Sequence, residues 1–184
     1  MTGFCGIVLA AGAGSRFGGP KALAHGADGV PWLVRVVSVL RAGGCDRVVV
    51  VLGARAEEAL PLVPDGTEAV VAADWAEGMA ASLRAGLAAA DGADAVVVAT
   101  VDIPDLPAAA VERLRAASPR PSDALAQAVY AGRPGHPVVI GASHREALAA
   151  SLTGDRGARP FLVAHGVHEV ECGDLWSGED VDRR

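Results

Sequence analysis

Short apolar runs, rich in valine and other β-branched residues, alternate with Ala- and Leu-rich segments of helical spacing through the first hundred residues. We predict strands at residues 5–11, 48–52, 67–73 and 95–101. Between them we predict helices at residues 30–40, 55–62 and 77–90. Buried strands that alternate with helices are typical of a parallel sheet with crossover connections. The pattern therefore predicts an α/β fold in which helices cover both faces of a mostly parallel sheet.

The second part of the chain is less regular but continues the same class of fold. We predict a helix at residues 107–117, a strand at 123–130, a turn-rich loop at 131–137 and a short strand at 138–140. Two short helices at 143–152 and 159–164 precede a last strand around 167–172. Since no repeat or low-complexity linker divides the sequence, we expect residues 1–184 to form a single three-layer α/β/α domain with a Rossmann-like sheet.

The composition narrows the classes of function. Hydrophobic residues make up 51% of the 184 residues and aromatic residues only 4%, so we expect a core of Ala, Val and Leu. The net charge of −6 argues against a general nucleic-acid binder, because affinity for a phosphate backbone depends on clustered Lys and Arg. Any polyanionic ligand must therefore be held by a local cluster of cations.

Cysteine usage, the first residues and the lengths of the apolar runs favour a cytoplasmic protein. Cys5, Cys45 and Cys172 are an odd number without close spacing, so they match neither a disulfide framework nor a zinc site. The first residues lead directly into a predicted strand and do not resemble a signal peptide. No apolar stretch approaches the ~20 residues of a membrane span. We therefore expect a soluble cytoplasmic protein that binds neither nucleic acid nor membrane.

The segment that follows the first predicted strand is rich in glycine and carries two cations. Its glycines allow several backbone N–H groups to point at one anion, and Arg16 and Lys21 add charged donors. The glycine spacing is not that of a Rossmann GxGxxG loop, and Ala22 follows Lys21 where a Walker loop needs Ser or Thr. An ordinary glycine-rich connection is the alternative. We predict a binding loop for a nucleoside triphosphate, with the candidate residues Leu9, Ala10, Ala11, Gly12, Ala13, Gly14, Ser15, Arg16 and Lys21.

Asp102 is the second chemical feature at this end of the predicted sheet. It directly follows the otherwise apolar strand at 95–101, and ligands of open α/β sheets bind beyond the carboxyl ends of the strands. A carboxylate there can hold Mg²⁺, which takes one or two protein carboxylates together with substrate phosphates. The alternative is an N-cap for the helix near Pro107, from which Asp102 is separated by several residues.

The loop at residues 9–21 resembles the signature loop of the nucleotidyltransferases that share the nucleotide-diphospho-sugar transferase fold. Further blocks at 74–83 (DWAEGMAASL), 101–104 (VDIP), 135–137 (GHP) and 154–159 (GDRGAR) narrow the resemblance to the molybdenum cofactor cytidylyltransferases. The resemblance covers nearly the whole chain. It implies CTP and molybdopterin as substrates, Mg²⁺ as the cofactor, and a molybdenum hydroxylase as the recipient of the product.

The same resemblance implies roles for further residues. It makes Asp102 the ligand of the catalytic metal and places Gly78 and Ser82 beside the nucleotide. The family often ends with a block like Asp-Ile-Asp-Thr-Pro-Glu-Asp, and this chain has Trp176 where the second aspartate would stand. Asp174 is therefore the remaining candidate for a second metal ligand in that block.

The blocks at 135–137 and 154–159 carry the candidates for contact with the acceptor substrate. His136 either positions its loop or contacts the acceptor, and both interpretations remain open. Arg156 and Arg159 either bind a phosphate of the acceptor or belong to a solvated charged loop. Met79, with helical spacing to other apolar residues, is expected to pack in the core.

These residues predict nucleotidyl transfer. The terminal phosphate of the acceptor attacks the α-phosphorus of the triphosphate, and pyrophosphate leaves. Arg16, Lys21 and Asp102 are the predicted catalytic residues, acting by positioning and charge neutralisation. The alternatives are a guanylyltransferase that uses GTP, an enzyme that activates another phosphorylated metabolite, and a protein that senses a nucleotide without turnover.

Overall fold

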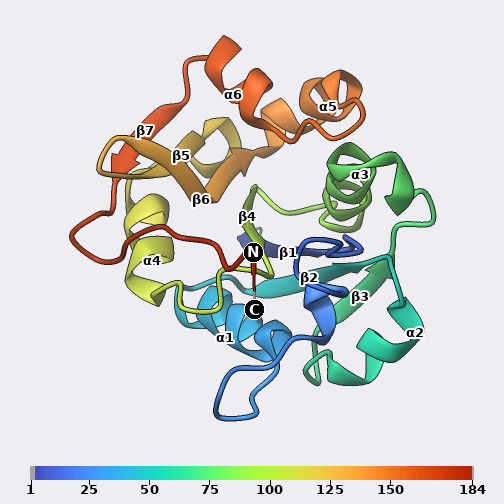
Figure 1. Ribbon diagram of the computed structural model, residues 1–184. Coiled ribbons are helices and arrows are strands. Elements are labelled where there is room, and N and C mark those ends of the chain that lie inside the picture. Colours follow the sequence, from blue (N-terminus) through green and yellow to red (C-terminus); the bar gives the residue numbers. More distant parts are fainter. Residues whose placement is uncertain (1–2, 184) are drawn as a thin grey trace.

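One seven-stranded sheet organises residues 3–183, the part of the chain that the computed structural model describes (Figure 1). Its strand order is β3-β2-β1-β4-β6-β5-β7. The strands are β1 (Phe4–Ala10), β2 (Arg47–Leu52), β3 (Glu68–Val71), β4 (Ala95–Thr100), β5 (Leu125–Tyr130), β6 (Arg133–Gly141) and β7 (His168–Glu171). Strand β6 is antiparallel to both of its neighbours, and the other pairs are parallel. The predicted mostly parallel α/β sheet is confirmed. Met1 and Thr2, the first residues of the segment on which the signal-peptide expectation rests, lie outside the described residues, as does Arg184.

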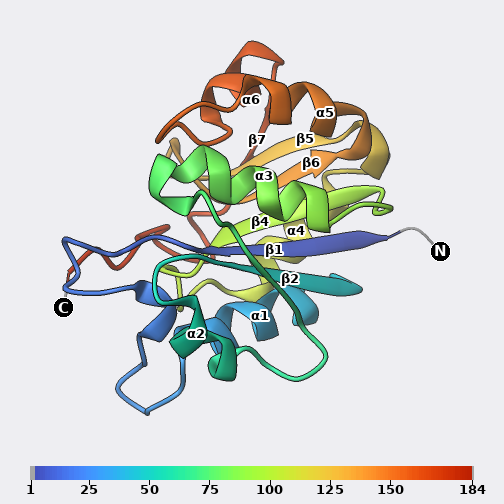
Figure 2. The same ribbon diagram turned by 90° about the vertical axis from the view of Figure 1, so that its right-hand side faces the viewer.

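Helices cover both faces of this sheet (Figure 2). They are α1 (Trp32–Ala42), α2 (Ala56–Ala59), α3 (Met79–Ala89), α4 (Ala108–Ala116), α5 (Ala142–Ser151) and α6 (Arg159–Ala164). Because side chains alternate along a strand, Val48 and Val50 of β2 pack in the same core cluster as α1 and α4, whereas Val49 packs with α3, α5 and α6. Full burial of each valine contributes roughly 1.5–3 kcal/mol, and together these layers fix the sheet rigidly. None of the helices in the described part of the chain is long and apolar enough to cross a membrane.

The order of the strands creates a crevice between β1 and β4. Strands β1, β2 and β3 extend the sheet in one direction, and the chain then returns to place β4 on the other side of β1. Leu9 of β1 pairs with Thr100 of β4, and the amide of Val101 donates to the carbonyl of Leu9 at 3.1 Å. Ligands of doubly wound sheets bind where the order reverses in this way. The glycine-rich loop after β1 and Asp102 after β4 therefore leave the sheet side by side.

The predicted loop at residues 131–137 is wrong, because most of it belongs to strand β6. The turn is confined to Ala131 and Gly132, whose φ values are 51° and 75°. Two left-handed residues make a turn of the type that joins antiparallel strands with a two-residue loop. Tyr130 and Arg133 pair immediately beside it, so the hairpin carries His136 within a strand rather than in a loop.

Helix α3 begins two residues later than predicted. Residues Trp75–Glu77 form a separate 3₁₀ turn, and Gly78 follows it with a φ of 117°. This left-handed conformation interrupts the helical path, so Met79 becomes the first residue of α3. The break directs the start of α3 toward the crevice between β1 and β4.

Candidate active site

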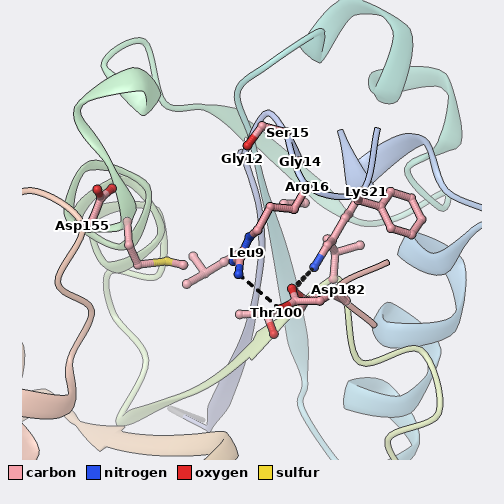
Figure 3. Close-up of a pocket in the computed structure, with 14 residues that line it drawn as sticks. Leu9, Gly12, Gly14, Ser15, Arg16, Lys21, Thr100, Asp155 and Asp182 are labelled. Carbon is pink, nitrogen blue, oxygen red and sulfur yellow. Dashed lines mark hydrogen bonds and ion pairs between the residues drawn. The ribbon is translucent and has the colours of Figure 1, made fainter. Parts of the chain in front are cut away.

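A cavity of about 470 Å³ lies at the carboxyl ends of β1 and β4 (Figure 3). We call it the loop cavity. The structure brings most of the predicted nucleotide-binding residues to its wall, together with the predicted metal ligand: Leu9, Ala10, Gly12, Gly14, Ser15, Arg16, Lys21 and Asp102. The remaining predicted nucleotide-binding residues line a neighbouring hollow of about 350 Å³, here called the α3 hollow: Ala11, Ala13, Gly78 and Ser82, with Leu9 and Gly12 shared between the two.

The glycine-rich loop is shaped to leave a row of amides free. The carbonyl of Gly14 accepts hydrogen bonds from the amides of Phe17, Gly18 and Gly19 at 2.9, 3.0 and 3.1 Å. Gly14 has a φ of 60°, and a Cβ on it would lie 2.0 Å from the carbonyl oxygen of Gly19, so no larger residue fits this turn. Within the described chain, the amides of residues 13–16 have no hydrogen-bond acceptor. A row of unpaired amides at the end of a buried strand is a ready site for phosphate oxygens.

Lys21 lies between two carboxylates in this cavity. Its Nζ is 2.9 Å from Oδ2 of Asp102 and 2.9 Å from Oδ1 of Asp182, and its side chain is only 14% exposed. Burial lowers the pKa of Lys21, but the hydrogen bonds to Asp102 and Asp182 outweigh burial and hold that pKa above its ordinary value. Arg16 lies 3.5 Å from the same Asp182 and is mostly exposed. Lys21 is therefore charged at neutral pH, and both Lys21 and Arg16 line the cavity.

The C-terminal segment supplies acidic groups that the sequence did not indicate. The amide of Val181 donates to the carbonyl of Asp102 at 2.8 Å and so fastens this segment beside β4. Among the described residues, carboxylate oxygens of Asp102, Asp180 and Asp182 all lie within 4.8 Å of one another. Mg²⁺ and Mn²⁺ prefer such oxygen ligands, so this donor set fits the divalent ion that the resemblance implies.

Asp174, the predicted second metal ligand, does not belong to this group. Its carboxylate pairs with the guanidinium of Arg113, at 2.5 and 2.9 Å, and that pair lines neither the loop cavity nor its neighbours. Trp176 packs edge-on against Tyr130, with ring centroids 5.3 Å apart. The structure therefore does not bring Asp174 to the cavity: its block packs against α4 and β5, and from this segment Asp182 reaches the cavity wall.

A third space, the apolar hollow, has a volume of about 220 Å³ and adjoins the loop cavity. His136 and Arg159, two predicted acceptor-binding residues, line it. Nδ1 of His136 lies 3.2 Å from the carbonyl of Val98, and loss of solvent lowers the pKa of His136 below its ordinary value. Arg156 lines a different hollow, with Pro160 and His165, so the structure does not bring it to this group. The turn before α6 directs Arg156 and Arg159 into separate spaces.

Met79 and Asp155 are the residues that link these spaces. Together with Leu9, both line the loop cavity, the α3 hollow and the apolar hollow. Met79 is 39% exposed, so the expectation that it packs in the core is wrong. It is the first residue of α3, where helical spacing to later apolar residues does not require burial. Asp155 stands in a block that the sequence singled out for its arginines.

Comparison with known proteins identifies the family. The model of the MobA-like NTP transferase domain matches residues 6–170. The chain is 40% identical to a protein named nicotine blue oxidoreductase from Paenarthrobacter nicotinovorans. This match extends over 193 residues and covers 96% of this chain and 91% of that relative. It is 39% identical over 119 residues to a molybdenum cofactor guanylyltransferase from Rhodobacter capsulatus, covering 62% of this chain and 58% of the relative.

Solved structures agree with this result. Rv0371c from Mycobacterium tuberculosis H37Rv superposes with a TM-score of 0.84 at 33% identity, covering 99% of this chain and 93% of that one. A crystal structure of Rv0371c in complex with manganese gives a TM-score of 0.76 at 30% identity, covering 93% and 89%. The family match spans most of the sequence, including both loops that form the loop cavity. The chain therefore belongs to the MobA-like NTP transferase family of nucleotidyltransferases.

Proposed function

We propose that this protein transfers a nucleoside monophosphate from a nucleoside triphosphate, CTP in the first instance, to the terminal phosphate of a molybdopterin-type acceptor, with release of pyrophosphate. The observation that carries the proposal is the contact of Lys21 with Asp102 in a cavity that is also lined by Gly14, Ser15 and Arg16, whose amides are unpaired. The Rhodobacter relative named as a molybdenum cofactor guanylyltransferase supports this type of acceptor, and it makes GTP the second candidate nucleotide.

The chain's own groups would act by positioning and by neutralising charge. The amides of residues 13–16 hold the β- and γ-phosphates, and Arg16 adds planar donors at the open side of the cavity. Lys21, released from one of its carboxylates, stabilises the charge that develops on the departing pyrophosphate. An acceptor phosphate is already ionised near neutral pH, so the reaction needs no general base.

Asp102, with Asp180 and Asp182, would hold a divalent ion, for which we propose Mg²⁺. Such an ion supplies charge neutralisation between the phosphates of donor and acceptor. The manganese complex of Rv0371c supports the use of a divalent ion in this family. We place the reaction in the cytoplasm, with a molybdenum hydroxylase as the recipient of the product.

Release of pyrophosphate tests the proposed reaction. Purified protein, Mg²⁺ and molybdopterin are incubated with CTP, GTP, ATP or UTP, and pyrophosphate is measured with a coupled assay. We expect release that requires both the acceptor and one preferred nucleotide, and we expect Lys21→Ala to lower the rate by about 10²–10³-fold. Nucleotide binding without any pyrophosphate would favour the nucleotide sensor instead.

An oxidoreductase is the second candidate, favoured by the 40% identity to a relative that bears that name. In this case the loop cavity would hold the phosphates of a reduced nicotinamide dinucleotide, and the apolar hollow would hold an unsaturated ring that accepts the hydride. Asp102→Asn separates the two reactions, because hydride transfer needs no metal ion. Loss of nucleotidyl transfer in this variant supports our proposal. Oxidation of NADH or NADPH that survives in it supports the oxidoreductase.

A further inference from the structure

The apolar hollow is lined mostly by aliphatic side chains and contains four polar ones. Its walls come from the aliphatic residues Leu9, Leu83, Val98, Val138, Ile140 and Leu162. Two of its polar side chains already bind each other: Arg159 donates to the amide oxygen of Gln127, whose Nε2 donates to the carbonyl of Gly135 at 3.1 Å. The other two polar residues of the lining are His136 and Asp155. Both have acceptor atoms without a partner among the described residues.

Asp155 presents an unpaired carboxylate where the hollows meet. Within the described residues its carboxylate has no hydrogen bond and no ion pair. Figure 3 shows it across the space from the glycine-rich loop. Its turn is fixed by the amide of Ala80, which donates to the carbonyl of Gly154 at 3.0 Å. Gly78 leaves room for it, since a Cβ at Gly78 would lie 2.3 Å from Oδ1 of Asp155. The backbone beside Asp155 is thus fixed, while its carboxylate is exposed and is not neutralised by a cation.

His136 adds a second acceptor to the same hollow. A carbonyl oxygen only accepts, so the contact with Val98 requires the proton on Nδ1. The lowered pKa of His136 keeps the ring neutral at pH 7, which leaves Nε2 with a lone pair. Within the described residues Nε2 has no donor. The ring lies in strand β6, between Pro134 and Val138, which both pair with β5, and its Nδ1 contact with Val98 ties it to β4.

We propose that Asp155 and His136 are specificity-determining residues that select an uncharged, flat acceptor ring by its N–H donors, of the kind found on a 2-amino-4-oxopyrimidine edge. This inference rests on the proposed function and specifies which part of the acceptor is recognised. A carboxylate accepts two parallel N–H bonds, from a ring nitrogen and an adjacent amino group. A ring edge that carries only lone pairs would leave both acceptors desolvated and unpaired, which is unfavourable.

The size and polarity of the hollow support a ring rather than the whole acceptor. Its volume of about 220 Å³ is below the ~300–1,000 Å³ of sites for drug-sized ligands, so it admits one or two fused rings. The cations of the loop cavity remain for the phosphates. The acceptor would therefore place its ring in the apolar hollow and its phosphate in the loop cavity, with Met79 and Leu9 between them.

Binding of a small fluorescent ring tests this inference without turnover. The probes are 6-methylpterin and its 2-dimethylamino derivative, which has no N–H on the exocyclic nitrogen. The proteins are the wild type, Asp155→Asn, and the control Asp91→Asn, which changes an exposed carboxylate that lines none of these spaces. We expect the wild type to bind 6-methylpterin at least 10-fold more tightly than the dimethylated ring, and Asp155→Asn to lose about 10-fold in affinity for 6-methylpterin. Asp91→Asn should bind as the wild type does.

Further measurements distinguish a loss of ring recognition from a general loss of protein structure. The affinity for CTP should not fall in Asp155→Asn, because the substitution removes a negative charge from the wall of the cavity that would hold the phosphates. His136→Gln, which keeps an acceptor oxygen, should bind 6-methylpterin more tightly than His136→Phe. Equal binding of the two rings by the wild type, or loss of CTP affinity with unchanged pterin affinity in Asp155→Asn, would overturn the inference. The pyrophosphate assay tests the reaction separately: pterin binding that depends on Asp155 in a protein that releases no pyrophosphate would contradict only the proposed function.

Discussion

Replacing Lys21 by methionine should have opposite effects on metal binding and on turnover. The side chain keeps its length and apolar stem but loses the charge that lies 2.9 Å from both Asp102 and Asp182. A divalent ion held by these carboxylates would compete with Nζ for their oxygens. The variant should therefore bind the ion more tightly, while it loses the cation that stabilises pyrophosphate.

The magnitude follows from the Lys21–Asp102 pair. At 2.9 Å and an effective dielectric constant of ~20, the Coulomb attraction is about 6 kcal/mol, an upper limit because both groups lose hydration. Their side chains remain 14% and 20% exposed, so we take the net value of a charged hydrogen bond, about 1.5–3 kcal/mol. In Lys21→Met the ion no longer has to break this hydrogen bond, and a gain of about 1.5 kcal/mol raises the affinity for the ion about 10-fold. Loss of a preorganised donor should lower turnover by about 10²–10³-fold.

Manganese binding provides the assay. Free Mn²⁺ is measured by electron paramagnetic resonance during titration of the wild type, Lys21→Met and Arg113→Met. The last variant is a matched control, because Arg113 pairs with Asp174 outside the carboxylate group. Its affinity for Mn²⁺ should equal that of the wild type. Unchanged or weaker Mn²⁺ binding by Lys21→Met would show that Nζ does not occupy the position of the ion, and our reasoning on this site would be refuted.

Other predictions concern the same loop and the C-terminal segment. The hydrogen bond from Lys21 lowers the pKa of Asp182, so the stability that this contact contributes is present above the unfolded value of 3.8 and is lost as pH falls through the lower folded pKa. The melting temperature of the wild type should therefore fall more steeply below pH 4 than that of Asp182→Asn, and parallel profiles would contradict this. Gly14→Ala should lower the melting temperature by at least ~2–4 °C, because left-handed backbone costs alanine ~1–2 kcal/mol before the contact with Gly19 is counted. Gly12→Ala, where a Cβ meets open space, should leave the melting temperature unchanged, and equal losses in the two variants would refute the role of the turn.

The central strands could be predicted from the sequence because burial on both faces leaves a plain signal. The valine-rich runs of β2 and β4 admit few polar residues, and the helices between them repeat their apolar positions with helical spacing. The glycine-rich loop could also be recognised as a candidate binding loop, because glycines and cations directly after a buried strand seldom serve the fold alone. Lys21 and Asp102 are 81 positions apart, but the rule that parallel strands share their carboxyl ends was enough to bring them together.

The C-terminal part of the site could not be predicted in this way. Asp180 and Asp182 stand in a segment without helix or strand, and their position depends on tertiary contacts: the hydrogen bond from Val181 to Asp102 and the ion pairs of Asp182 with Lys21 and Arg16. No local pattern encodes such a contact. The resemblance to the family's final block suggested Asp174 instead, but Arg113 on α4 binds that carboxylate.

The hairpin at Ala131 and Gly132 shows a second limit. Two prolines and a glycine in residues 133–137 are typical of a loop, yet pairing with β5 holds this stretch as a strand. Pairing with β5 outweighed the local preference for a loop, and His136 is therefore a residue of strand β6 that lines the apolar hollow. Asp155 was missed for a different reason: its neighbours are arginines, which are the more familiar ligands of phosphate.

The most direct test of the central claim is a crystal structure with a non-hydrolysable CTP analogue and Mn²⁺. We predict anomalous density for manganese between Asp102 and Asp182, the β- and γ-phosphates on the amides of residues 13–16, and Nζ of Lys21 moved from a carboxylate to a phosphate oxygen. A nucleotide bound outside the loop cavity, or one whose phosphates lie away from Lys21 and Asp102, would contradict the account.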